Sequence, residues 1–257
     1  QKDPTDPSTY ELPYLNIDPQ EYESLEDLPV FNKGCDSSYS WSKKYKHLQR
    51  KGSPDEIVER ITEMMKSPSN PKGRFQHPNG VWQHMCFTEP LMKHAQKAVP
   101  DILRAFKDDE YNMPESVTFE TNGTQELTPQ FIDFFTNRGK FDQELFFSVS
   151  PKLETVSGEK RSKAIKPDTL KTYRMLSKHG QLKFVLGAEE RQWEEMEDVL
   201  SDLRNVGIDY PVWIMPVGAL AEQQEETAGE VAQKAFKRGY NVSARVHCYL
   251  WGNTIGV

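Results

Sequence analysis

Polar and ionisable residues gather at six places in this sequence, each next to an apolar segment that could form a buried strand. They include hydroxyl, carboxylate, amide, amine and imidazole groups, which together can bind a polar ligand through hydrogen bonds and charge. The places are Cys35-Asp36-Ser37, Thr88-Glu89-Pro90, Glu120-Thr121-Asn122-Gly123-Thr124, Ser148-Val149-Ser150-Pro151-Lys152, Met215-Pro216-Val217-Gly218 and His247-Cys248-Tyr249. Each alone is a weak signal, because turns favour Ser, Asn, Gly and Pro on conformational grounds. Together they predict one polar ligand site.

The segments around these places alternate between strand and helix patterns. Apolar runs rich in Val, Ile and Phe predict strands over 81–88, 117–120, 145–149, 182–186, 212–217 and 241–246. Amphipathic stretches predict helices over 91–107, 129–137, 167–179, 189–206 and 219–238. This βαβα alternation is typical of a parallel sheet covered by helices, and both an incomplete α/β barrel and a doubly wound sheet fit it. In either architecture the ligand binds at the carboxyl ends of the strands.

The N-terminal part of the sequence has a different composition. Residues 1–27 are rich in Pro, Asp and Glu and predict an extended N-terminal arm, followed by a single barrel domain over 28–257 that opens with a short strand near 28–31. Ser53-Pro54-Asp55-Glu56 predicts a helix start with a Ser cap, Pro at the first position and Glu completing a capping box. Residues 67–80 carry too many Pro, Gly and Asn residues for regular structure and predict a loop.

The composition argues against nucleic-acid and membrane partners. The chain has 257 residues, a formal net charge of −7 and a pI near 5.5, whereas nucleic-acid-binding proteins usually display a basic face. No apolar run has the length of a membrane span, and the first residues lack the basic and apolar regions of a signal peptide. We therefore expect a cytoplasmic protein. A homodimer, the commonest assembly, is left open.

Three widely separated cysteines, Cys35, Cys86 and Cys248, form neither a disulfide framework nor a Cys-x-x-Cys zinc motif. Cys86 and Cys248 lie in or beside predicted strands, so we expect them to be packing residues. We expect the tryptophans at 82, 213 and 251 to belong to the core.

Seven short segments, in this order, resemble the 7-carboxy-7-deazaguanine synthases, radical S-adenosylmethionine enzymes of deazapurine and queuosine synthesis. They are CDSSYSW, FT-EPLM, ETNGT, SVSPKL, LKFV, MPVG and VHCYLWGN, within residues 31–257. The resemblance implies a truncated parallel α/β barrel of the radical SAM type, a [4Fe–4S] cluster, S-adenosylmethionine and Mg²⁺. It implies a carbon–nitrogen lyase that contracts the ring of 6-carboxy-5,6,7,8-tetrahydropterin to 7-carboxy-7-deazaguanine with loss of ammonia. An electron donor such as flavodoxin or ferredoxin is the implied protein partner.

The resemblance also implies roles for individual residues. Cys35 would bind one iron of the cluster, and the hydroxyl of Ser37 would bind Mg²⁺, a hard ion that prefers oxygen ligands. The residues implied to bind S-adenosylmethionine are Glu89, Thr121, Asn122, Ser150 and Lys152. The residues implied to bind the pterin are Glu120, His247 and Val257.

The sequence departs from the family pattern in three places. The family's three closely spaced cluster cysteines are represented by Cys35 alone, and one thiolate cannot hold a [4Fe–4S] cluster. Two glycines expected before Glu89 are missing, as is a Gln-Gly-Glu-Gly stretch before Leu28. Such glycines let the backbone approach a cofactor closely.

Two interpretations of these departures stay open. One is that active-site loops are missing from this sequence, since loops that bind a metal lose their order without it. The other is a catalytically silent barrel of the same family that acts as a ligand- or protein-binding module. A third hypothesis, an unrelated α/β-barrel enzyme with Glu89 or Glu120 as acid or base, does not explain the matching segments.

Overall fold

The centre of the structure, a computed structural model, is a six-stranded sheet. The described residues are 18–29, 39, 43–107, 112–137 and 141–252. The strands are β1 (Met85–Thr88), β2 (Ser116–Thr121), β3 (Glu144–Val149), β4 (His179–Leu186), β5 (Val212–Pro216) and β6 (Asn241–Val242). All neighbours are parallel, and their order in space is their order in the chain. A doubly wound sheet reverses its strand order at a switch point, so this order favours the sheet of an incomplete α/β barrel, with β1 and β6 at its edges.

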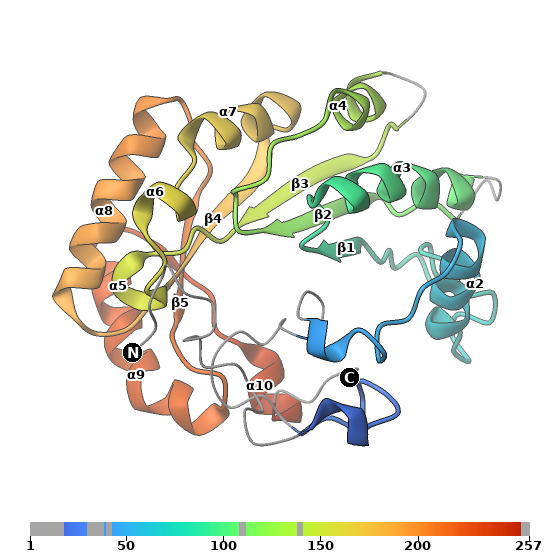
Figure 1. Ribbon diagram of the computed structural model, residues 1–257, viewed down its shortest axis with the longest axis horizontal. Helices are drawn as coiled ribbons and strands as arrows, with labels where there is room; N and C mark the ends of the chain where they lie inside the picture. Colours follow the sequence, from blue (N-terminus) through green and yellow to red (C-terminus); the bar gives the residue numbers. More distant parts are fainter. Residues whose placement is uncertain (1–17, 30–38, 40–42, 108–111, 138–140, 253–257) are drawn as a thin grey trace.

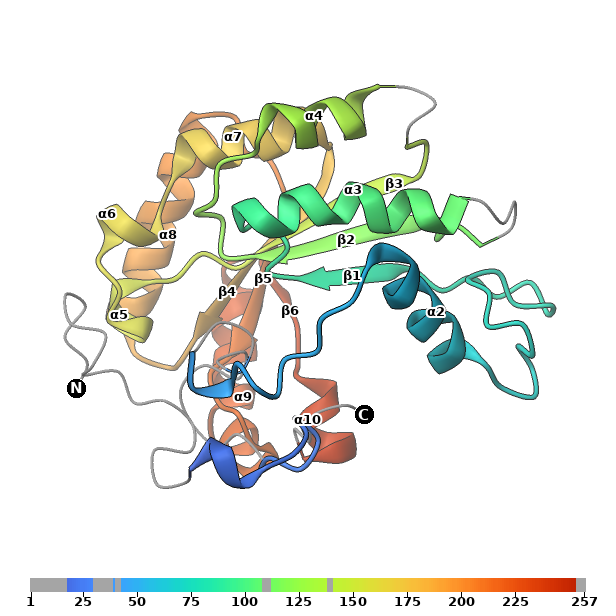
Figure 2. The same ribbon diagram turned by 45° about the vertical axis from the view of Figure 1, so that its right-hand side comes forward.

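A layer of helices covers the outer face of this sheet (Figure 1). One long helix follows each of the first five strands, and both views show these helices outside the sheet (Figure 2). They are α3 (Lys93–Lys107), α4 (Pro129–Thr136), α7 (Pro167–Leu176), α8 (Glu190–Asn205) and α9 (Ala221–Lys237). The short helices α5 (Glu154–Ser157) and α6 (Arg161–Ala164) lie between β3 and α7. The α/β architecture with a parallel sheet is therefore confirmed.

The remaining elements lie either beside the helix layer or on the opposite side of the sheet. Helix α2 (Pro54–Met65) packs against α3. Helix α10 (Val246–Trp251) and the short 3₁₀ helices η2 (Pro19–Glu21) and η3 (Lys43–Tyr45) lie on the inner side of the sheet in both views. The helices η2 and η3 contact each other, and a small second apolar cluster beside them buries Leu28, Tyr45 and Leu48. The predicted boundary at residue 28 stays a prediction.

The main core lies between the outer face of the sheet and the helices. Successive side chains of a strand point to opposite faces, and most residues of β2 to β5 that face the helices are apolar. Phe119, Phe147, Phe184 and Ile214 are all 0% exposed. Phe119 contacts Phe147 and the ring of Phe131 from α4, with centroid separations of 5.9 and 5.6 Å. Burial of each such ring contributes about 2–3 kcal/mol, so this face stabilises the fold.

The predicted helix start at Ser53 is confirmed. Ser53 Oγ accepts a hydrogen bond from the Glu56 backbone at 3.3 Å, and the Glu56 carboxylate accepts one from the Ser53 backbone at 2.6 Å. These bonds satisfy donors that have no partner inside the helix.

Several predicted boundaries are wrong. Strand β1 begins at Met85 instead of residue 81, because residues 75–83 pair with each other through a bridge between Gln76 and Trp82. Helix α7 ends at Leu176 instead of residue 179, and Gly180, a residue type that commonly follows the end of a helix, lies inside β4. Strand β6 has two residues, and the chain enters α10 at Val246.

The prediction that three tryptophans are core residues is also largely wrong. Trp82 is 40% exposed and Trp251 is 51% exposed. Trp213 is half-buried on β5. Among the helices that the structure describes, none is long and apolar enough to span a bilayer.

Gly180 tests the packing of β4. A Cβ atom there would lie 2.7 Å from the Tyr210 ring and 2.8 Å from the Phe147 carbonyl oxygen. Gly180→Ala is therefore expected to lower the free energy of unfolding by about 1–3 kcal/mol in urea titrations. The matched control is Gly229→Ala in α9, where a Cβ meets nothing within 4 Å; it is expected to raise stability by about 1 kcal/mol. A Gly180→Ala variant as stable as the wild type would contradict this packing.

Candidate functional site

Three of the predicted polar segments lie side by side at the carboxyl ends of β1, β2 and β3. Hydrogen bonds of the parallel ladder continue past the strand ends, with Glu89 N donating to Glu120 O at 2.8 Å and Ser150 N donating to Thr121 O at 2.7 Å. Glu89, Asn122 and Ser150 therefore follow three adjacent strands at one edge of the sheet. We call Glu89, Asn122, Ser150 and Lys152 the rim.

The turn after β2 is built by its own side chains. Thr121 Oγ1 accepts from Gly123 N at 3.2 Å, and Asn122 Oδ1 accepts from the backbone and hydroxyl of Thr124 at 3.0 and 2.7 Å. Gly123 has φ +83, and a Cβ there would lie 2.8 Å from Leu170, so the turn requires glycine. Thr121 is 3% exposed and supports the turn from inside; its predicted cofactor contact stays a prediction.

The carboxylate of Glu89 is partly withdrawn from solvent. Burial raises the pKa of Glu89 above its ordinary value; the Lys152 ammonium and a hydrogen bond from the Asn122 backbone oppose this shift, and the Glu120 carboxylate adds to it. Lys152 also donates to Ser150 Oγ at 3.3 Å. Burial therefore disfavours the charged form of the Glu89 carboxylate, and the neighbouring groups offset this cost only in part. A cationic ligand group would complete that compensation.

The backbone of Glu89 is strained. Its φ of +50 is the one positive value outside glycine in the part of the chain that the structure describes. Left-handed backbone costs an L-residue about 1–2 kcal/mol, and such strain often marks functional sites. The turn after β1 therefore holds Glu89 in a conformation that glycine adopts freely.

The inner face of the sheet carries a row of polar residues. Thr88, Glu120, Ser148 and Gln181 are register partners across β1 to β4, and Gln181 Nε2 donates to Ser148 Oγ at 2.9 Å. Parallel sheets are usually apolar on both faces, and barrel interiors are usually filled by Val, Ile and Leu. A polar inner face next to the rim therefore extends the candidate site from the strand ends onto the sheet.

Sequence reasoning missed two inner-face residues, Gln181 and Lys183. Lys183 Nζ lies 3.3 Å from Glu120 Oε1, across β3. The sequence carries a signal for both residues in the alternation of polar and apolar residues along HGQLKFVL, since alternate residues of a strand share one face.

The other predicted site residues are not brought to the rim by the described contacts. His247 is exposed on α10 rather than at a strand end, with Nε2 3.4 Å from the Arg245 guanidinium. Helix α10 is tied to the turn after β5, because Arg245 donates to Gly218 O at 3.1 Å and the Cys248 thiol donates to Ala219 O at 3.1 Å. Cys35, Ser37 and Val257 lie outside the described residues.

The cysteines of this chain do not fit a [4Fe–4S] cluster. A cluster of the implied kind needs three thiolates close together, and the sequence contains three cysteines in all. Cys248 is 1% exposed, as expected of a packing residue, and its thiol is engaged by Ala219. Cys86 is exposed on edge strand β1, which contradicts a packing role, yet desolvation by its neighbours raises its thiol pKa to about 11. Within the described ranges, no three metal-binding side chains gather at one point.

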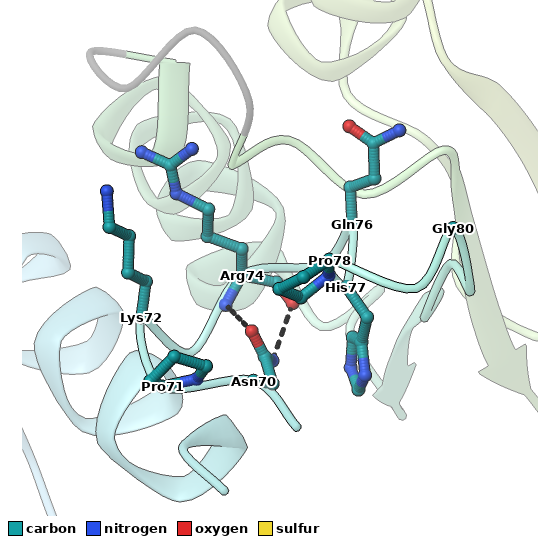
Figure 3. Close-up of a pocket in the computed structure, with 8 residues that line it drawn as sticks. All are labelled: Asn70, Pro71, Lys72, Arg74, Gln76, His77, Pro78 and Gly80. Atoms are coloured by element: carbon teal, nitrogen blue, oxygen red, sulfur yellow. Dashed lines mark hydrogen bonds between the residues drawn. The ribbon is translucent and has the colours of Figure 1, made fainter. Parts of the chain in front are cut away.

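A hollow lies away from the rim, in the loop that leads into the amino end of β1 (Figure 3). Its volume is about 490 Å³, and its lining residues are Asn70, Pro71, Lys72, Arg74, Gln76, His77, Pro78 and Gly80. The side chain of Asn70 fixes this loop, donating to Met65 O and Arg74 O and accepting from Arg74 N. Lys72 and Arg74 extend to one side of the loop and His77 turns to the other. In α/β barrels the amino-terminal side serves stability rather than ligand binding.

In comparisons with known proteins, no protein-family model matches this chain, and neither a curated protein nor a solved structure gives a match. The family resemblance therefore rests on the seven sequence segments alone.

Glu89 predicts a pH dependence of stability. A folded pKa above the unfolded one means that ionisation of Glu89 disfavours the folded state, so this destabilisation is absent at low pH and grows as pH rises through the raised pKa. Glu89→Gln is therefore expected to gain stability over the wild type between about pH 4.5 and neutral pH, measured as free energies of unfolding across that range. Glu225→Gln, on the exposed side of α9, is the control and should follow the wild-type curve. A constant difference between Glu89→Gln and the wild type would contradict the buried-charge account.

Proposed function

We propose that this chain is a radical-SAM-type half-barrel, of the 7-carboxy-7-deazaguanine synthase kind, that binds S-adenosylmethionine and a carboxylated pterin at its strand ends. The observation that supports this most is the gathering of Glu89, Asn122, Ser150 and Lys152 at one edge of a parallel sheet. The resemblance implies the same four residues as contacts of the cofactor.

The chemistry of the rim matches the amino-acid end of the cofactor. The ammonium of S-adenosylmethionine would pair with the Glu89 carboxylate, whose raised pKa reflects a charge that lacks full compensation. Lys152 would pair with the cofactor carboxylate and Ser150 would donate or accept a hydrogen bond. The polar inner face would then receive the pterin, because its carboxylate, amide and amine can bind a ring edge rich in donors and acceptors.

Radical ring contraction is the second candidate function, because the resemblance implies it and the rim residues lie together at one edge of the sheet. A [4Fe–4S] cluster would supply the electron that starts such chemistry, and the cysteines of this chain do not fit that group. We therefore propose ligand binding as the function of this chain and derive no radical step from its residues.

The binding proposal predicts the effect of two rim substitutions. Glu89→Gln and Lys152→Gln are each expected to weaken S-adenosylmethionine binding about 10- to 100-fold in isothermal titration calorimetry, since each removes a charged hydrogen bond. Lys171→Gln removes the same charge from an exposed position on α7 and should leave the affinity unchanged. Equal affinities of the wild type and both rim variants for S-adenosylmethionine would contradict the proposed site.

Iron content separates the two candidate functions. After anaerobic reconstitution with iron and sulfide, ligand binding without radical chemistry predicts substoichiometric iron and no 5′-deoxyadenosine from S-adenosylmethionine. A full cluster on each chain together with cofactor cleavage would establish the second candidate instead.

A further inference from the structure

One ion pair crosses the middle of the inner face. Lys183 on β4 reaches Glu120 on β2, with 3.3 Å between Nζ and Oε1, although β3 lies between the two strands. The β3 residue in register with Glu120 is Ser148, and its small side chain leaves room for the lysine to pass. Ser148 is held by its hydrogen bond from Gln181. The ion pair therefore spans the intervening strand past a small residue.

This arrangement differs from a common surface salt bridge. The side chain of Lys183 is 19% exposed and that of Glu120 is 40% exposed, whereas lysines are mostly solvated. Holding a long side chain in one conformation costs rotamer entropy, and half-exposed ion pairs contribute little net stability. The Lys183–Glu120 pair therefore serves to orient the Glu120 carboxylate more than to stabilise the fold.

The pair leaves a defined acceptor for a ligand. Lys183 contacts Oε1 of Glu120, and an ionised carboxylate has a second oxygen that only accepts hydrogen bonds. A ligand edge placed against that oxygen has to carry N–H or O–H donors. Trp213 is the register partner of Lys183 and is half-buried on the same face, which offers an aromatic surface to a planar ring.

We infer that Lys183 is a positioning residue that holds Glu120 as the acceptor for the 2-amino, N3–H edge of a planar aminopyrimidinone ring. The inference rests on the proposed pterin ligand. It goes further, because it names the edge of the ring that Glu120 would recognise and the residue that orients Glu120 for that recognition.

Two ligands that differ at this edge provide the test. Pterin-6-carboxylate carries the 2-amino group, and lumazine-6-carboxylate carries an oxygen in its place. In fluorescence titrations the wild-type chain is expected to bind the pterin about tenfold or more tightly, because a carbonyl oxygen cannot donate to Glu120. Lys183→Gln is expected to bring the ratio of the two affinities to within about threefold. Lys183→Arg should restore discrimination, and Lys171→Gln is the charge-matched control.

The ratio is measured on one protein at a time, so a general loss of stability does not change it. Glu120→Gln gives a second route should Lys183→Gln fail to fold, since an amide can donate to the lumazine oxygen and the ratio is expected to fall as well. If the ratio of pterin to lumazine affinity is unchanged in Lys183→Gln, the inference is overturned and the proposed pterin class is not affected. The same holds for an unchanged ratio in Glu120→Gln where only that variant folds. Failure of the wild-type chain to bind either ligand overturns the proposed pterin class and the inference with it.

Discussion

Parallel pairing of six strands in chain order is the constraint on which the rest of this structure depends. It carries all the strand carboxyl ends to one edge, so segments more than 60 residues apart in the chain, such as Glu89 and Ser150, become neighbours. It also forces each connection back across the sheet, and the returning helices cover a single face (Figure 1). The outer face buries phenylalanines against those helices, while the inner face keeps polar residues. The division between apolar core residues and polar inner-face residues follows from the two-residue period of a strand.

The rim and the inner face carry features that a fold optimised for stability alone would avoid. Glu89 combines a partly buried carboxylate with left-handed backbone, and each of these disfavours the folded state. Lys183 is held across a neighbouring strand instead of being solvated. These features concentrate at the strand ends and on the adjacent sheet face, where ligands bind in α/β folds. Their position therefore supports a site that a ligand completes.

Much of the architecture could be predicted from the sequence, because it depends on local patterns. Hydrophobic period and caps predicted every strand of the sheet and every long helix, including the start at Ser53. Predictions for short segments were wrong where the local pattern is ambiguous. Gly180 has the residue type of a helix stop but lies in a strand against the Tyr210 ring. The apolar residues Val246–Trp251 form α10 instead of following a longer strand. The rim could be predicted from strand ends, whereas the pairing of Lys183 with Glu120 depends on register across three strands, which no local pattern encodes. The predicted metal residues Cys35 and Ser37, and Val257, lie outside the described residues.

The central claim, that the strand carboxyl ends form the ligand site, is tested most directly by amide hydrogen exchange with and without S-adenosylmethionine. Bound ligand restricts local opening and slows exchange where it contacts the backbone. Our account predicts slower exchange in Thr88–Glu89, Asn122–Thr124 and Ser150–Lys152, with residues 70–80 unchanged. Slower exchange confined to the hollow at residues 70–80, with the strand ends unaffected, would contradict it.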